Sequence, residues 1–236
     1  MLMNIKGKHI IVTGGSLGIG RETAKSLIEK GAKVLVTGRS EDRLKKSFGD
    51  LDCQTIAFDI GDSFNIHKNA QNCLDLLDGK IDVLINNAGI GERKTIEELT
   101  IDSFMKVFNV NVFGLALFTK EIVPVMKINN GGTIINIGST ASLKGYQTGS
   151  IYAASKFAVR CLSQCWQAEL RPHNIRVCQI NPSEVTTAFG RPERIERDEV
   201  HNKLTSKEIA HAITSAIEMD DRGFINELNV WATNPF

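Results

Sequence analysis

The stretch TGGSLGIG, residues 13–20, decides the fold, and it begins where the short apolar run HIIVT (9–13) ends. Its glycines at positions 14, 18 and 20 let the backbone turn tightly and approach a phosphate group closely. Residues 18–30, which come next, have helical spacing. The start of this predicted helix therefore points its free N–H groups and the positive end of its dipole at the glycine turn. The stretch therefore predicts a diphosphate site between a strand and a helix. It is not a P-loop, because no Gly-Lys-Ser/Thr follows it.

Short apolar runs rich in β-branched residues recur along the chain, and longer segments of helical spacing separate them. The predicted strands are residues 9–13, 33–37, 54–58, 81–86, 133–137, 175–181 and, more weakly, 224–231. Runs this apolar are typical of strands that are covered on both faces. The predicted helices include residues 18–30, 103–126, 150–170 and 205–219, the last of which starts with a Thr205/Glu208 capping box.

This alternation predicts an α/β fold in one domain over residues 1–236. The expected architecture is a Rossmann-type, doubly wound parallel sheet of about seven strands with helices on both faces. One charged stretch, GRPERIERDEVHNKL (190–204), breaks the alternation between a strand end and a helix. Two interpretations stay open for it: a solvated loop, or a mobile lid at about 188–204 over a site at the carboxyl ends of the strands.

Composition narrows the function classes. The 236 residues are 42% hydrophobic, with 28 basic against 27 acidic side chains and a net charge of +1, so neither disorder nor nucleic-acid binding is favoured. The apolar stretches are shorter than the roughly 18 residues of a membrane span, and the N-terminus has no signal-peptide pattern. The five cysteines lack CxxC spacing. They are typical of free thiols in a reducing compartment, and a metal site is not favoured. We expect a cytoplasmic protein without membrane contact.

The end of the second predicted strand indicates the type of dinucleotide. Folds of this type that prefer NAD carry a carboxylate there for the ribose hydroxyls. This chain has Gly38, which leaves space, followed by Arg39 and Ser40. A guanidinium and a hydroxyl suit a 2′-phosphate, so the sequence favours NADP(H) over NAD(H).

Four polar residues carry the predicted chemistry. Tyr152 and Lys156, in YAASK, are four residues apart and share one helix face. A nearby ammonium lowers the pKa of a phenol, which can then give a proton to a carbonyl oxygen or remove it in reverse. Ser139 follows the strand 133–137, where its hydroxyl can bind that carbonyl. Asn111 lies inside an apolar helix, where a buried amide needs partners or marks a kink.

In this order the motifs resemble the short-chain dehydrogenase/reductase superfamily over essentially the whole chain. The resemblance rests on the glycine turn, Asp59, NNAG at 86–89, Asn111, Ser139 and the Tyr152/Lys156 pair. It implies hydride transfer between a nicotinamide ring and a ketone or aldehyde carbon. It also implies Tyr152 as general acid/base, Ser139 as the carbonyl anchor, Lys156 on the nicotinamide ribose and Asn111 as the holder of a water.

Motifs and resemblance together name the cofactor-binding residues. These are Gly14, Ser16, Leu17, Gly18, Ile19, Gly20, Arg39, Ser40, Asp59, Ile60, Asn87, Ala88, Gly89, Tyr152, Lys156, Pro182, Val185 and Thr187. Two positions depart from the family pattern: Leu17 stands where many members have a basic residue, and Ser183 replaces a glycine after Pro182. The first departure removes one phosphate contact, and the second puts a side chain near the nicotinamide pocket.

The expected activity is the NADPH-dependent reduction of a small-molecule carbonyl substrate. Two reductase alternatives stay open, one for 3-oxoacyl-acyl-carrier protein and one of sepiapterin type, and a non-catalytic NADP-binding regulator is the alternative of another class. The residues expected to face the substrate pocket are Leu143, Tyr146, Gln147 and Phe189. The family resemblance implies a homodimer or homotetramer with its interface on the helices 103–126 and 150–170.

Overall fold

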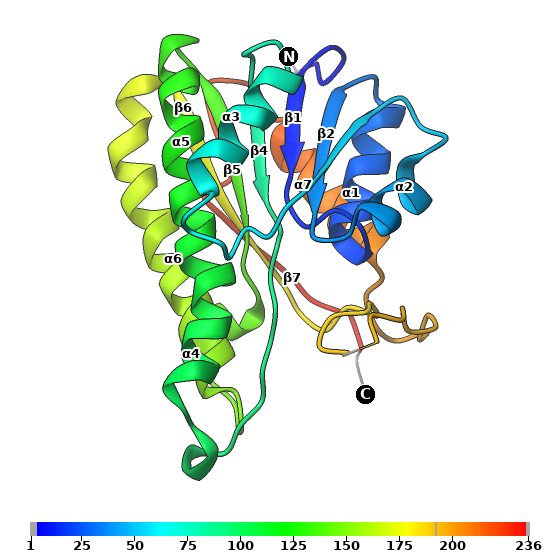
Figure 1. Cartoon of the computed structure of the whole chain (residues 1–236), viewed down its shortest axis with the longest axis vertical. Helices are drawn as coiled ribbons and strands as arrows, with labels where there is room; N and C mark the ends of the chain where they lie inside the picture. Colours follow the sequence, from blue (N-terminus) through cyan, green and yellow to red (C-terminus); the bar gives the residue numbers. More distant parts are fainter. Residues whose placement is uncertain (1–3, 192, 235–236) are drawn as a thin grey trace.

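A seven-stranded parallel sheet in the order β3-β2-β1-β4-β5-β6-β7 forms the centre of the computed structural model, which describes residues 4–191 and 193–234 (Figure 1). The strands are β1 His9–Val12, β2 Lys33–Gly38, β3 Gln54–Ala57, β4 Val83–Asn86, β5 Gly132–Ile137, β6 Ile175–Pro182 and β7 Glu227–Val230. The predicted fold class is confirmed.

Helices cover both faces of the sheet (Figure 1). On one face lie α1 Gly18–Glu29, α2 Glu41–Phe48 and α7 Ser206–Ile217, and on the other lie α3 Ile66–Leu76, α4 Ile101–Phe108, α5 Leu115–Ile128 and α6 Ser150–Leu170. Short 3₁₀ turns occur at Ile96–Glu98, Thr140–Ser142 and Arg171–His173. Successive residues of a strand face opposite layers, so Ile10 and Val12 pack with α1 and α7 while Ile11 packs with α3 and α5.

β1 pairs with β2 on one side and with β4 on the other. The strand order therefore runs outward in one direction from β1 to β3 and in the opposite direction from β4 to β7. Because every pair is parallel, the segments that follow β1, β2, β4, β5 and β6 all leave the sheet at the same edge. Such a reversal opens a crevice at the carboxyl ends of the strands. The fold therefore gathers the predicted site residues, which are distant in sequence, at one place.

One prediction about an individual element was wrong, and another is refined. The run 54–58 does not form a strand covered on both faces, because β3 is the edge of the sheet and Gln54, Thr55 and Ala57 are exposed. The predicted helix 103–126 is interrupted by a π-helical turn at Asn109–Gly114, between α4 and α5. A Cβ on Gly114 would collide with the carbonyl oxygen of Ile60, so the widened turn passes close to the segment after β3.

The stretch Ile101–Ile128 corrects the expectation that every apolar segment is too short to span a membrane. By length and composition this helical stretch of 28 residues is long and apolar enough. Its inner face nevertheless lies in the protein core, where Phe118, Ile122 and Met126 are fully buried against the sheet. This is the packing expected of a core helix.

Candidate active site

A cavity of about 940 Å³ opens at the carboxyl edge of the sheet. This volume is within the range of about 300–1,000 Å³ for small-molecule sites. All the predicted catalytic and cofactor-binding residues line it except Gly20 and Asn111. The segments after six strands, β1 to β6, together with the start of α6, thus bring the predicted site together.

The glycine turn forms the floor of this cavity. Gly14 and Gly18 have left-handed backbone angles, with φ of +65° and +57°. A Cβ on Gly14 would also lie 2.6 Å from the Cα of Ala88, so only glycine lets the two turns meet. Gly20 lies behind the cavity, where a side chain would strike the Asn87 amide; it permits close packing instead of touching a ligand.

Thr13 and Asn87 lock the turns after β1 and β4 together. The Thr13 hydroxyl accepts hydrogen bonds from the backbone N–H groups of Asn87 and Ala88, both at 3.1 Å. The Asn87 side chain donates to the carbonyls of Thr13 and Gly14, both at 3.0 Å. Asn87 lines the cavity as predicted, but its amide is engaged in this structural tie, and the sequence reasoning missed the part played by Thr13.

Three arginines gather where β2 ends. Arg39 and Arg43 come from the turn and first helical turn after the strand, and Arg194 reaches the same cavity from the segment 188–204. Burial lowers the pKa of Arg194, and repulsion from Arg39 and Arg43 lowers it further. Within the described ranges, no carboxylate forms an ion pair with any of the three. This end of the cavity is therefore suited to an anion.

Ser139, Tyr152 and Lys156 line the other end of the cavity. The Tyr152 ring lies 5.4 Å from the ring of Phe189, and the Lys156 ammonium lies 5.8 Å from the centre of the Tyr152 ring. Lys156 is buried and donates a hydrogen bond of 2.7 Å to the carbonyl of Ile137. A serine hydroxyl, a phenol and an ammonium thus share one wall.

The electrostatics of this wall differ from the sequence expectation that Lys156 lowers the pKa of Tyr152. Burial raises the pKa of Tyr152 well above its ordinary range, although a hydrogen bond with Ser139 partly opposes this. Burial also lowers the pKa of Lys156 from 10.5 to about 8. Desolvation dominates because both groups are withdrawn from water. The phenol consequently stays protonated at neutral pH, which is the form that can give up a proton.

Asn111 lies directly behind the cavity wall, inside the π-helical turn. Its side-chain oxygen accepts a 2.9 Å hydrogen bond from the backbone of Ile90, and its amide donates to the Ile90 carbonyl and to the Ser155 hydroxyl. The buried amide thus finds partners, as the sequence required. These hydrogen bonds fix Ile90, in the segment after β4, next to the π-helical turn.

The segment 188–204 is tied across the cavity by charged contacts. The Glu196 carboxylate accepts a 2.9 Å hydrogen bond from the backbone N–H of Gly18 and a 2.7 Å one from Arg21. Arg197 binds the carbonyl of Val185 and the carboxylate of Glu184. In Figure 1 this segment is the gold loop below α1. These contacts hold the segment against the start of α1 and the residues just after β6, so it is not a freely solvated loop.

The substrate side of the cavity matches the prediction in part. Tyr146 and Phe189 line it, but Leu143 and Gln147 do not, so these two residues were wrongly predicted. Sequence reasoning also missed Arg93, whose guanidinium lies 5.9 Å from the centre of the Tyr146 ring, and Trp231, which follows β7. Neither residue belongs to a motif that would signal its place.

Comparison with known proteins identifies related sequences. A family model described as short chain dehydrogenase matches residues 8–198. An uncharacterised oxidoreductase of Thermotoga maritima is 33% identical over 94% of each chain. A dehydrogenase/reductase SDR family member 7B of Xenopus tropicalis is 33% identical and a 3-ketodihydrosphingosine reductase of mouse 30%, over 75% and 87% of this chain. The alignments span only 61% and 64% of these two vertebrate relatives.

Solved structures resemble the fold over nearly its whole length. An alcohol dehydrogenase of Thermococcus sibiricus complexed with 5-hydroxy-NADP has a TM-score of 0.88 at 25% identity, with 97% of each chain covered. A serine dehydrogenase complexed with NADP+ has a TM-score of 0.86 at 28% identity, with 94% of each chain covered. The fold and the neighbours together support a nicotinamide cofactor.

The Glu196 carboxylate accepts a hydrogen bond from the backbone N–H of Gly18, a donor that a cofactor diphosphate would need. We predict that Glu196→Ala tightens NADPH binding about 3- to 10-fold, because a competing and repelling carboxylate is removed from the start of α1. Fluorescence titration of NADPH measures the dissociation constant. Glu199→Ala, an exposed change in the same segment, is the matched control. Equal or weaker binding by the Glu196 variant would contradict the competition.

Proposed function

The chain belongs to the short-chain dehydrogenase/reductase family, and from this premise we propose that it reduces a ketone or aldehyde carbonyl to an alcohol with NADPH. Family membership makes it an oxidoreductase that acts on CH–OH or C=O groups. The proposal rests on one observation: Ser139, Tyr152 and Lys156 share a single cavity with the glycine turn.

The residues present fit a nicotinamide dinucleotide. Gly14 and Gly18 line the cavity in left-handed conformations that bring the backbone close to Ala88 and Thr187, and the N-terminus of α1 supplies N–H donors for a diphosphate. Asp59 and Ile60 would lie beside the adenine, Lys156 would hold the nicotinamide ribose, and the segment Pro182–Thr187 would bind the carboxamide. When bound, the nicotinamide supplies the hydride for the carbonyl carbon.

The protein itself handles the proton. Tyr152 is protonated at neutral pH and would transfer its proton to the carbonyl oxygen as negative charge develops there. The Ser139 hydroxyl would donate a hydrogen bond to the same oxygen and fix its position. Carbon and oxygen thus each gain one hydrogen, and the product is an alcohol.

Preference for NADP(H) is supported by the anion site at the end of β2. A 2′-phosphate carries two negative charges that the guanidinium groups of Arg39, Arg43 and Arg194 could share. Ser40 accepts a hydrogen bond from the backbone of Arg43 and keeps its own hydroxyl hydrogen for a phosphate oxygen. Arg43 and Arg194 would replace the basic contact that is missing at Leu17.

The substrate we propose is a small carbonyl compound. Tyr146, Phe189 and Trp231 offer aromatic surface in the cavity that Tyr152 lines, and the Phe189 ring lies against that of Tyr152. Assembly as a homodimer or homotetramer is supported by the exposed apolar side chains Met105, Phe113 and Phe157 on α4, the π turn and α6. Five free thiols are compatible with the proposed cytoplasmic location.

Replacing Tyr152 tests the proposed function. Tyr152→Phe should lower the rate of carbonyl reduction about a hundredfold or more, because the proton donor is lost. The dissociation constant of NADPH should stay the same, since the ring that lines the cavity remains. Steady-state turnover and fluorescence titration measure the two quantities. Unchanged function in this variant would favour the non-catalytic regulator.

The arginine cluster makes a second prediction. Arg39→Gln and Arg194→Gln should each weaken NADPH binding about 10- to 100-fold, since a charge-assisted contact is worth roughly 1.5–3 kcal/mol, and should leave NADH binding unchanged. Arg222→Gln, on a highly exposed side chain away from the cavity, is the control. Equal losses for both cofactors would show that the arginines do not read the 2′-phosphate.

The lowered pKa of Lys156 predicts a pH dependence. The group holds its proton below its pKa of about 8 and loses the proton above that value. The kcat/KM for NADPH, which reports on the free enzyme, should therefore be level near pH 7 and fall as pH rises through about 8. Initial rates in buffers of constant ionic strength measure this profile. A kcat/KM for NADPH that stays constant up to about pH 9.5 would contradict this prediction, because Lys156 would have lost its proton well below that pH.

A further inference from the structure

A row of polar side chains crosses the interior of the sheet towards Ser139. Asn86, Asn136, Gln179 and Glu227 stand opposite one another on β4, β5, β6 and β7. Asn86 donates to Asn136 at 2.9 Å, and the Ser163 hydroxyl, from α6, connects Asn136 to Gln179 at 2.9 and 3.0 Å. Buried amides of this kind fix one another's orientation because each donor needs an acceptor.

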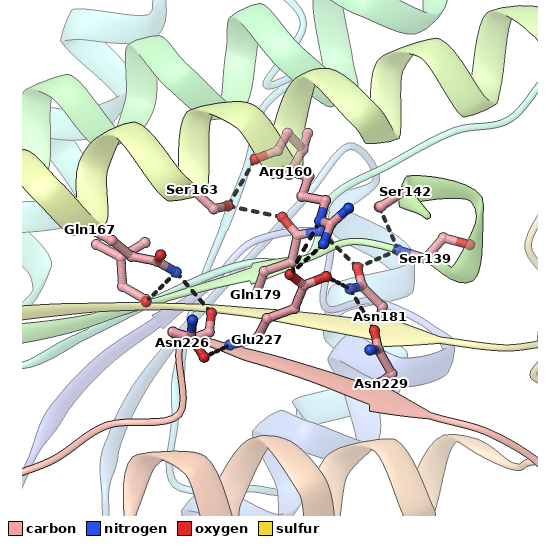
Figure 2. A network of polar contacts seen from close by, with 12 residues as sticks. Ser139, Ser142, Arg160, Ser163, Gln167, Gln179, Asn181, Asn226, Glu227 and Asn229 are labelled. Atoms are coloured by element: carbon pink, nitrogen blue, oxygen red, sulfur yellow. Dashed lines mark hydrogen bonds and ion pairs between the residues drawn. The ribbon is translucent and has the colours of Figure 1, made fainter. Parts of the chain in front are cut away.

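Asn181, near the end of β6, joins this row to the active site (Figure 2). It is fully buried, and its side-chain oxygen accepts hydrogen bonds from the backbone N–H of Ser139 at 3.2 Å and from the Gln179 amide at 2.7 Å. The Ser142 hydroxyl accepts from the same Ser139 N–H at 3.2 Å. The backbone of Ser139 is thus fixed by side chains outside the predicted catalytic set.

Glu227 decides which way the Asn181 amide points. The Asn181 NH₂ group donates to one Glu227 oxygen at 2.7 Å and to the side-chain oxygen of Asn229 at 2.9 Å. A carboxylate only accepts hydrogen bonds, so the NH₂ end must face it and the oxygen end must face Ser139. The reversed amide would set its NH₂ group against the Ser139 N–H.

Arg160 uses the other oxygen of the same carboxylate. Its Nε and Nη2 atoms lie 3.1 and 3.0 Å from Glu227 Oε2, and Figure 2 shows the guanidinium reaching from α6 to β7. Both carboxylate oxygens are therefore occupied by donors, one from Asn181 and one from Arg160. A glutamine at this position would turn its NH₂ group toward one of these two partners and leave that donor without an acceptor.

The chain leaves room for this arrangement at Gly138, directly before Ser139. A Cβ there would collide with the Asn181 oxygen and lie 2.7 Å from the Gln179 nitrogen. The two amides thus pack against the bare backbone at the end of β5. This contact places the row against the peptide that carries Ser139.

From this geometry we infer that Glu227 is a positioning residue for Ser139 and acts through the side-chain amide of Asn181. The inference rests on the proposed function in so far as Ser139 is the carbonyl anchor. The last strand of the chain would then hold the hydroxyl donor in place from outside the cavity. Neither residue belongs to the motifs that identify the family.

The test compares four forms of the full chain by hydrogen exchange of the Ser139 amide, measured by NMR. Glu227→Gln leaves one acceptor oxygen, which the charged Arg160 competes for, so Ser139 protection should fall about 5- to 10-fold. Adding Arg160→Met to that change frees the oxygen for Asn181 and should restore protection. Gln167→Met is the control, because Gln167 binds the Asn226 carbonyl just before the same strand without reaching Ser139.

Kinetics provide the second readout, with 2,3-butanedione as the carbonyl probe. The kcat should fall in Glu227→Gln and recover in the double variant, while the NADPH dissociation constant stays unchanged. Unaltered Ser139 protection in Glu227→Gln, or an equal loss in Gln167→Met, would overturn the inference. Failure of the proposed function would appear differently, as wild-type protein that turns over no carbonyl while the exchange pattern holds.

Discussion

Parallel pairing of β1 with both β2 and β4 is the constraint on which the rest of the molecule depends. It sends every strand's carboxyl end to one edge, so residues between positions 14 and 231 line one cavity. It also brings the turns after β1 and β4 so close that Gly14 touches Ala88 and Thr13 must satisfy two backbone donors. The cofactor cradle is thus a consequence of sheet topology as much as of the glycines themselves.

Burial is the second physical theme. Burial raises the pKa of the Tyr152 phenol and lowers that of the Lys156 ammonium, so the phenol gives up its proton less readily and the ammonium more readily. Burial also makes an amide without hydrogen bonds unfavourable in free energy. In the row from Asn86 to Asn181, hydrogen bonds link the buried amides across three strands. A polar interior of this kind specifies one arrangement of side chains, which suits a site that must position a hydroxyl and a phenol together.

The sequence predicted well what short-range rules determine. Short apolar runs and helical spacing placed the strands and most helices, the Thr205/Glu208 capping box formed as expected, and motif order brought Ser139 and Tyr152 to one cavity. What it missed depends on long-range contacts. The π turn places Gly114 against Ile60, and Arg194 reaches the cavity from a segment without regular structure in which Glu196 binds the start of α1. The direction of the Tyr152 pKa depends on burial, which residue spacing does not reveal.

The most direct test of the central claim is consumption of reduced cofactor by the purified chain. Oxidation of NADPH and of NADH would be followed by absorbance with ketones, aldehydes, diketones, pteridines and acyl thioesters. The account predicts that at least one of these carbonyl compounds is reduced to its alcohol, one NADPH being consumed per alcohol formed, and that NADH supports a much slower reaction. Tight binding of NADPH without oxidation by any carbonyl compound in this set would contradict it.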